Sequence, residues 1–272
     1  MRNTLDLFLA SKKKSYKYKK YFSVYDEMFS IYKDKKITFV EIGVLDGGSL
    51  EMWKNFFGDK ARIIGIDLNP ECKKFESNGI EIFIGDQGDK NFWKHFFDKV
   101  GKVDIILDDG SHRNEHQILT TLYTIPNIKN GGLLAFEDTI TSYWRKYGNP
   151  HKYSFINFTK KLIDDLNFTH PGENSFKISL NKFVYSIRYF ENFCIFYIDK
   201  RRCIFNERIE NSGTKYENEN FVNKKSKIKK FSKKISKLFP FLKKIRLVTN
   251  FYQLIIYISL KLKNYSLKSF FK

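Results

Sequence analysis

Short apolar stretches rich in β-branched residues recur through the first half of the chain. Residues 37–42 read ITFVEI and lead into Gly43, which is typical of a buried parallel strand that feeds a tight turn. Helix-compatible stretches lie between the apolar ones, at 89–99 and 113–122. Strands that alternate with helices predict a parallel sheet covered on both faces, with ligands beyond the carboxyl ends of the strands. Four further apolar stretches carry a carboxylate at or beside their end, at residues 61–68, 80–86, 103–109 and 132–138.

The later part of the chain follows a different pattern. Residues 153–166 have the spacing of a helix. The segments KFVYSIRYF (182–190) and NFCIFYIDK (192–200) then read as two strands, connected at Glu191 and Asn192. So short a connection requires an antiparallel pair. The sequence therefore predicts an α/β protein whose doubly wound sheet ends in an antiparallel hairpin.

The formal net charge of +19 is unevenly distributed. Residues 224–272 contain 15 Lys or Arg and no Asp or Glu, which leaves +4 for residues 1–223. The charge therefore bears on localisation or partners of the tail rather than on the main domain. Three cysteines without C-x-x-C spacing indicate neither a disulfide framework nor a zinc ribbon, and no signal-peptide pattern opens the chain. We therefore expect a cytoplasmic protein.

The turn after the first strand, VEIGVLDGGSLEMW (40–53), has Glu41 before its first glycine and places glycines at Gly43 and Gly47. A dinucleotide-binding fold has G-x-G-x-x-G instead. The spacing found here resembles the first motif of class I S-adenosylmethionine-dependent methyltransferases, in which the loop backbone approaches a ligand that carries an amino acid and no phosphate. A glycine turn without any ligand is the alternative.

Further polar residues follow in register with this turn. Asp67 lies 24 residues after Gly43 at the end of the second strand, where a carboxylate can accept hydrogen bonds from both ribose hydroxyls. Asp86 and Gln87 follow the third strand, where this family's adenine contacts usually come. Any one of these acids could instead cap a helix, but their common register favours a nucleoside. The cofactor-binding residues that we expect are Glu41, Gly43, Gly47, Asp67, Asp86, Gln87 and Asp108.

Carboxylates also end the fourth and fifth strands, which are neighbours in this topology. Asp109 ends the fourth strand, and Glu137 and Asp138 end the fifth. Three converging carboxylates would repel one another without a cation, and oxygen ligands suit Mg²⁺. His112, three residues beyond Asp109, would project beside the metal as a general base, with a helix-capping or solvated histidine as the alternative. His116, one turn further on, reads as structural.

A zinc site is a competing interpretation of the same stretch. Residues 112–116 read HRNEH and match the H-x-x-E-H pattern of inverted zinc metallopeptidases. That site needs both histidines on one helical face, one turn apart. His112 comes two residues after Gly110, at a strand-to-helix turn, so it would reach the first helical turn at best. We therefore favour magnesium over zinc.

Residues 16–199 resemble the metal-dependent sugar O-methyltransferases of the macrolide-tailoring type and their relatives in bacterial surface-polysaccharide (capsule) gene clusters. The segments EIGVLDGGSLEMW, GIDLNPEC, GDQGD, LDDGSH and FEDTITSYW carry the resemblance. It implies a Rossmann-like class I fold and S-adenosylmethionine as cofactor. It also implies that Asp109, Glu137 and Asp138 hold Mg²⁺ and that His112 is the base.

These features predict a sugar O-methyltransferase. Mg²⁺ would chelate two neighbouring hydroxyls and lower the pKa of one, and His112, with Asp109 beside it, would take that proton before methyl transfer. We expect a sugar or nucleotide-sugar acceptor, such as a nucleotide-linked heptose or a glycan intermediate of surface polysaccharide. Tyr143 and Trp144 could wall a sugar ring or pack in the core. A nucleic-acid methyltransferase and a non-catalytic membrane-surface scaffold are the alternatives.

The expected domains are an N-terminal helical cap (1–36), the methyltransferase domain (37–200), a linker (201–223) and a basic tail (224–272). Apolar residues at helical spacing alternate with lysines in the tail, and the apolar run 247–260 is too short to span a bilayer. We expect the tail to contact anionic lipid at the inner face of the membrane, or to dock on the enzyme or a second subunit. We do not expect nucleic acid as a partner, because no binding module is recognisable. The sequence leaves an oligomer open.

Overall fold

The computed structural model describes residues 3–76, 79–148, 152–167, 179–204 and 207–214, together with positions 254, 257, 258, 262, 265 and 268. The described residues up to Glu207 belong to one compact unit, and the described residues from Arg208 onward are assigned to a second. Apart from the six single positions, the predicted basic tail lies outside the described residues, so its membrane contact stays a prediction. Within the part of the chain that is described, no helix is long and apolar enough to cross a membrane.

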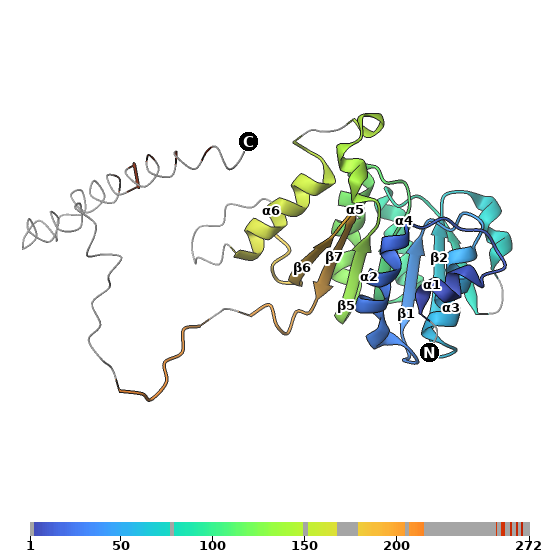
Figure 1. Cartoon of the computed structure of the whole chain (residues 1–272), viewed down its shortest axis with the longest axis horizontal. Coiled ribbons are helices and arrows are strands. Elements are labelled where there is room, and N and C mark those ends of the chain that lie inside the picture. The colour runs from blue at the N-terminus through green and yellow to red at the C-terminus, as the bar shows by residue number, and fades with distance from the viewer. Residues whose placement is uncertain are drawn as a thin grey trace, which may run out of the picture. The chain divides into compact units, whose positions relative to one another are not determined.

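The first unit is built on one seven-stranded sheet. Its strands are β1 (Thr38–Ile42), β2 (Arg62–Asp67), β3 (Ile80–Ile84), β4 (Val103–Asp108), β5 (Ile128–Phe136), β6 (Val184–Phe190) and β7 (Phe193–Ile198). Their order is β3-β2-β1-β4-β5-β7-β6. In Figure 1, β6, β7 and β5 lie on one side of β1, and β2 lies on the other. The first five strands are parallel, and β7 pairs antiparallel with both β5 and β6. The predicted doubly wound sheet with a closing hairpin is confirmed.

Helices cover both faces of this sheet. The hydrophobic cluster on one face includes side chains of α1 (Thr4–Leu9), α2 (Lys19–Phe29) and α3 (Gly48–Phe57). The cluster on the other face includes those of α4 (Lys90–Val100), α5 (Asn114–Thr124) and α6 (Phe155–Asn167). Short 3₁₀ turns complete the connections: η1 (Ser30–Tyr32), η2 (Pro70–Phe75), η3 (Ile125–Asn127), η4 (Thr139–Tyr143) and η5 (Arg145–Tyr147).

The strands are apolar on both faces because both faces are covered. In β1, Phe39 packs in the cluster beneath α2 and α3, whereas Val40 and Ile42 pack in the cluster on the opposite face. This is the two-residue alternation of a strand. It produces the continuous apolar runs seen in the sequence and places Glu41 on the same face as Phe39.

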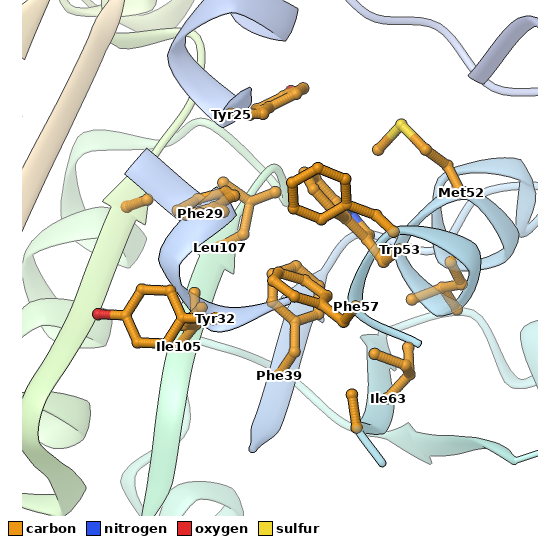
Figure 2. Packing of buried hydrophobic residues seen from close by; sticks show 14 of the residues in the cluster. Tyr25, Phe29, Tyr32, Phe39, Met52, Trp53, Phe57, Ile63, Ile105 and Leu107 are labelled. Carbon is orange, nitrogen blue, oxygen red and sulfur yellow. The ribbon is translucent and has the colours of Figure 1, made fainter. Parts of the chain in front are cut away.

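The N-terminal helices are part of the main core. The ring centroid of Phe29 in α2 lies 5.6 Å from that of Trp53 in α3 and 6.3 Å from that of Phe39 in β1. Figure 2 shows these rings together with Tyr25 and Phe57. All five side chains are fully buried. The segment that the sequence predicted as a cap is therefore fixed against the sheet, and its polar side chains are held close to the strand ends.

Two details of the strand boundaries depend on backbone conformation. Asn192, in the tight turn between β6 and β7, has φ +60°, a left-handed conformation that Asn tolerates better than most residues. β5 begins at Ile128, four residues before the predicted stretch. The sequence pattern missed these residues because Lys129 and Asn130 interrupt the apolar run. Gly131 follows them with φ +85°.

Candidate active site

A cavity of about 540 Å³ opens at the carboxyl ends of β1, β2, β3 and β4. The polypeptide turns that follow these strands form its walls, as expected for a parallel sheet. The cavity brings together four of the predicted cofactor residues and three of the predicted catalytic or metal residues: Gly43, Asp67, Asp86, Gln87, Asp109, His112 and Asp138.

Gly43 allows two strand ends to approach each other closely. It has φ +95°, and a Cβ atom at this position would lie 2.2 Å from the carbonyl oxygen of Asp109. Any other residue would have to displace the backbone at the end of β4. Gly47, with φ +79°, precedes α3 and does not line the cavity. Gly43 therefore allows the turn after β1 to pack closely against the backbone of Asp109, whereas Gly47 occupies the position just before α3.

Asp67 fixes the glycine turn from the end of β2. Its Oδ2 accepts hydrogen bonds from the backbone N–H groups of Val44, at 2.8 Å, and Leu45, at 3.3 Å. Its Oδ1 accepts from the N–H of Asn69 at 2.8 Å. A carboxylate oxygen can accept more than one hydrogen bond, so Asp67 can hold the turn and still present acceptors to a ligand in the cavity.

The polar residues after β3 and β4 form a buried network. The side-chain amide of Gln87 donates to Asp108 Oδ2 at 2.9 Å and to Thr120 Oγ1 at 3.1 Å, and its Oε1 accepts from the Ser111 N–H at 2.8 Å. Burial raises the pKa of Asp108 to about 6. Gln87 lines the cavity while it ties two loops together, whereas Asp108 lies outside the cavity lining. Asp86 is the more accessible neighbour, with 46% of its side chain exposed.

Asp109, His112 and Asp138 form a group that can hold a metal ion. One donor atom from each lies within 4.8 Å of the others, and each side chain is about one-fifth exposed. His112 Nε2 lies 3.6 Å from Asp138 Oδ2 and 3.9 Å from Asp109 Oδ1. His112 Nδ1 is buried and has no hydrogen-bond partner among the described residues.

Two members of this group have an unusual backbone. His112 has φ +56° and Asp138 has φ +52°, which is left-handed and uncommon for residues other than glycine. Thr141 links the two segments, since its hydroxyl lies 3.1 Å from the His112 carbonyl oxygen and 2.8 Å from that of Asp138. Strained residues cluster at functional sites and need such surrounding contacts to persist.

Glu137 is not a member of this group. Its side chain is 1% exposed, and the Tyr25 hydroxyl donates to its Oε1 at 2.5 Å. Burial, together with the charge of Asp109, raises the pKa of Glu137 well above its usual value. Among the described residues, the buried Glu137 carboxylate is thus not one of the clustered donor atoms, and its role as a metal ligand stays a prediction.

Lys17 is a site residue that the sequence did not reveal. Its side chain is 1% exposed, and Nζ lies 2.7 Å from Asp109 Oδ2, 3.1 Å from Glu41 Oε1 and 3.2 Å from both Glu137 oxygens. Burial by itself lowers the pKa of Lys17, but the carboxylates outweigh burial and raise it well above the usual value. Lys17 could not be singled out from the sequence, because it lies among several other lysines. The one sequence feature that could have indicated it is its spacing of four residues from Tyr21, which is repeated between Tyr21 and Tyr25.

The charges around the cavity fit a cationic ligand. Lys17 is the one buried ammonium described near the five carboxylates at the ends of β1, β4 and β5, and burial raises the pKa of Glu41 as well as that of Glu137. The carboxylate oxygens of Asp109 and Asp138, within 4.8 Å of each other, suit a hard divalent cation such as Mg²⁺. A positively charged sulfonium cofactor would offset the remaining negative charge in the same way. The five carboxylates belong to Glu41, Asp108, Asp109, Glu137 and Asp138.

The two histidines of the HRNEH stretch have different surroundings. His112 precedes α5 and is not helical, whereas His116 lies within that helix. His116 Nδ1 lies 2.9 Å from Ser111 Oγ. The group that can hold a metal contains His112 without His116 among the residues described. This geometry argues against a zinc peptidase site.

The N-terminal segment also covers part of the cavity. Ser15 and Tyr16 line it, although the sequence gave no reason to select them. The backbone N–H groups of Lys12 and Lys13 donate to Glu51 in the first turn of α3, at 3.0 and 3.4 Å. Contacts between distant segments, rather than a local motif, place these residues in the site.

Tyr143 and Trp144 are exposed, by 56% and 36%. Of the two interpretations that the sequence left open, the structure therefore does not support core packing. Their use as walls for a sugar ring stays a prediction.

The sheet order, the glycine turn and the strand-end carboxylates define the class I, S-adenosylmethionine-dependent methyltransferase fold. Within that class, the chain is similar to sugar O-methyltransferases. It is 34% identical over 164 residues to demethylmacrocin O-methyltransferase of Streptomyces fradiae, which covers 56% of this chain and 41% of that protein. It is 35% identical over 152 residues to mycinamicin VI 2''-O-methyltransferase of Micromonospora griseorubida, which covers 52% and 38%. No protein-family model matches the chain.

Solved structures show the same relationship. The MycE methyltransferase from the mycinamycin biosynthetic pathway, in complex with Mg, SAH and mycinamycin VI, superposes with a TM-score of 0.66 and 25% identity. The superposition covers 73% of this chain and 54% of that one. The predicted fold and family resemblance are thus confirmed. The matched region spans only about two-fifths of the length of the curated relatives.

Proposed function

We propose that this protein is an S-adenosylmethionine- and Mg²⁺-dependent O-methyltransferase that acts on a sugar hydroxyl. The observation that carries the proposal is a single cavity lined both by the predicted cofactor residues and by Asp109, His112 and Asp138. The similar proteins from Streptomyces and Micromonospora are named as O-methyltransferases, and the MycE complex contains Mg and SAH. These likenesses support both ligands.

Different residues of the cavity would bind the cation, remove the hydroxyl proton and hold the methyl donor. Bound Mg²⁺ would supply positive charge that favours loss of a proton from a sugar hydroxyl. Asp109 and Asp138 would hold the cation through the oxygens that face His112. His112 Nε2, which lies 3.9 and 3.6 Å from those two oxygens, would take the hydroxyl proton. The glycine turn and Asp67 would hold the methyl donor, so that the two reactants meet in register.

We also propose an acceptor that carries a phosphate, such as a nucleotide-linked sugar used for capsule or other surface polysaccharide. A second cavity, of about 840 Å³, begins at Arg113, directly after His112, and is also lined by Lys146, Tyr147 and Tyr153. Neither Arg113 nor Lys146 forms an ion pair with an acid among the residues described. Cationic side chains bind phosphate, and aromatic rings stack on bases. Glu115 also lines this cavity.

The direct test is transfer of a labelled methyl group from S-adenosylmethionine to a panel of sugar nucleotides, macrolide glycosides and RNA. We expect transfer to a sugar, loss of that transfer on chelation with EDTA, and recovery with Mg²⁺ but not with Zn²⁺ alone. Transfer that continues in EDTA would refute the metal requirement. Transfer restricted to RNA would favour the nucleic-acid methyltransferase, and its affinity would fall steeply with salt.

Arg113→Ala tests the phosphate-bearing acceptor. It should raise KM for a sugar nucleotide about tenfold, because a charge-assisted hydrogen bond to phosphate is lost, while kcat changes little. Arg145→Ala is the matched control, since Arg145 is exposed on the same loop region as Lys146 but does not line the cavity. Equal KM values for the two variants would place the acceptor elsewhere.

A further inference from the structure

Three side chains from the N-terminal segment reach the acids of the site at intervals of four residues. Residues four apart lie on one face of a helix. Lys17 precedes α2, and Tyr21 and Tyr25 lie on its first and second turns. Their partners are, in order, Asp109 at 2.7 Å, Asp138 at 2.6 Å and Glu137 at 2.5 Å. Tyr21 and Tyr25 on one face of α2, together with Lys17 just before the helix, are thus matched to the acids at the ends of β4 and β5.

Tyr21 holds Asp138 in two ways. Its hydroxyl donates to Asp138 Oδ1 at 2.6 Å and accepts a hydrogen bond from the Asp138 backbone N–H at 3.2 Å. Asp138 has the left-handed backbone described above, with φ +52°. Such a conformation persists only where surrounding contacts determine it. A single hydroxyl therefore fixes both the strained backbone of Asp138 and the rotation of its carboxylate.

As a result of these contacts, Asp109 and Asp138 each direct one particular carboxylate oxygen towards His112. Tyr21 occupies Oδ1 of Asp138, and Lys17 occupies Oδ2 of Asp109. The opposite oxygens, Oδ2 of Asp138 and Oδ1 of Asp109, lie 3.6 and 3.9 Å from His112 Nε2. Lys17 and Tyr21 therefore orient the two carboxylates through the oxygens that do not face His112, which leaves the oxygens facing His112 available to a cation.

We propose that Tyr21 is a positioning residue for the cation site because it orients Asp138. Lys17 orients Asp109 in the same way. The N-terminal segment that carries both residues therefore contributes directly to the active site. The inference rests on the proposed function, because it assigns Asp109 and Asp138 to a divalent cation. Outer partners that orient ligating carboxylates typically contribute a factor of about 10 to 100 to metal affinity. The hydroxyl of Tyr21 should contribute within that range.

The hydroxyl of Tyr21 can be removed without removing its ring. The ring packs against Tyr25 and Phe193, with centroids 6.4 and 5.3 Å away, and phenylalanine would keep both contacts. Tyr32→Phe provides a matched control. Tyr32 is likewise buried, and its hydroxyl donates to the Gly131 carbonyl at the start of β5, away from the carboxyl ends of the strands.

The experiment compares Mn²⁺ binding to the full-length wild-type chain, Tyr21→Phe and Tyr32→Phe by electron paramagnetic resonance. Tyr21→Phe should bind Mn²⁺ about 10- to 100-fold more weakly, whereas Tyr32→Phe should match the wild type. S-adenosylhomocysteine affinity, measured by calorimetry, should be the same in all three. The Mg²⁺ concentration for half-maximal transfer should rise with the Mn²⁺ Kd in Tyr21→Phe, and kcat at saturating Mg²⁺ should stay within about threefold of the wild type.

Unchanged Mn²⁺ affinity in Tyr21→Phe would overturn the inference while leaving the proposed function intact. Equal weakening in both variants would also overturn it, since the loss would then follow from general destabilisation. If the wild-type chain binds no Mn²⁺ and transfers no methyl group, the proposed function itself fails, and the inference fails with it.

Discussion

Replacing Lys17 by methionine is expected to lower the free energy of unfolding by about 3–5 kcal/mol at pH 8. The substitution keeps most of the side-chain volume but removes the ammonium that Glu41, Asp109 and Glu137 share. Glu41 and Glu137 are at most 1% exposed, so water cannot replace the lost cation. Breaking a buried ion pair from one side leaves uncompensated charge, which is why the effect is large.

The loss of unfolding free energy caused by Lys17→Met should become smaller as the pH falls. Burial raises the pKa of Glu41 and Glu137 above the usual 4.5, and Lys17 opposes this rise, so the pKa values climb further in the variant. A carboxyl group whose pKa is raised by folding stabilises the fold below its unfolded pKa and loses that contribution as the pH rises through the folded value. The raised pKa of Lys17 keeps the wild type stabilised below about pH 10.5. Urea unfolding at pH 5 and pH 8 measures the difference.

Lys20→Met is the control for this prediction. Lys20 is on the same segment, but its side chain is 72% exposed, and its partner Glu191 is exposed as well. An exposed ion pair contributes at most about 1 kcal/mol. If Lys17→Met were no less stable than Lys20→Met at pH 8, the ammonium would not be what offsets the buried acids.

Replacing His112 by alanine is expected to slow methyl transfer by about 10²- to 10⁴-fold, the usual contribution of a positioned general base. The Nε2 atom lies 3.6 Å from Asp138 Oδ2 and 3.9 Å from Asp109 Oδ1, beside the proposed cation position. Because Asp109 and Asp138 remain, the variant should still bind Mn²⁺ and S-adenosylhomocysteine. Single-turnover rates together with the two binding constants measure this combination.

His116→Ala separates the base from a zinc site. His116 Nδ1 contacts Ser111 Oγ and does not join the metal group, so this variant should keep its rate within about tenfold of the wild type. A zinc site built on both histidines would fail equally with either substitution. Full activity of His112→Ala would move the base elsewhere and leave metal activation of the hydroxyl as the main catalytic device.

The strands themselves and the polar residues at their ends follow from short-range patterns. A buried strand shows itself as an apolar run of five or six residues, and the acid that ends it is adjacent in sequence, so Asp67, Asp109 and Asp138 could be assigned to one edge of the sheet. Gly43 could also be predicted from the sequence, because the turn that contains it is formed by neighbouring residues. The antiparallel hairpin followed from the short connection at Glu191 and Asn192.

The side that each acid faces was decided by tertiary structure. Glu137 and Asp138 are neighbours in sequence, and nothing in a residue pair tells which one turns towards His112. The left-handed backbone of Asp138 and the Tyr25 hydroxyl on Glu137 separate them. Both features depend on α2 packing against α3 and β1 through its aromatic face.

The partners of these acids could not be read from the sequence for the same reason. Lys17 lies 92 residues from Asp109, and Tyr21 lies 117 residues from Asp138. Local periodicity determines which segments become strands and helices, and therefore where the ligand edge lies. Which donors meet which acids depends on how the N-terminal helix is docked, and that is set by the burial of its rings against Trp53 and Phe39, far away in the sequence.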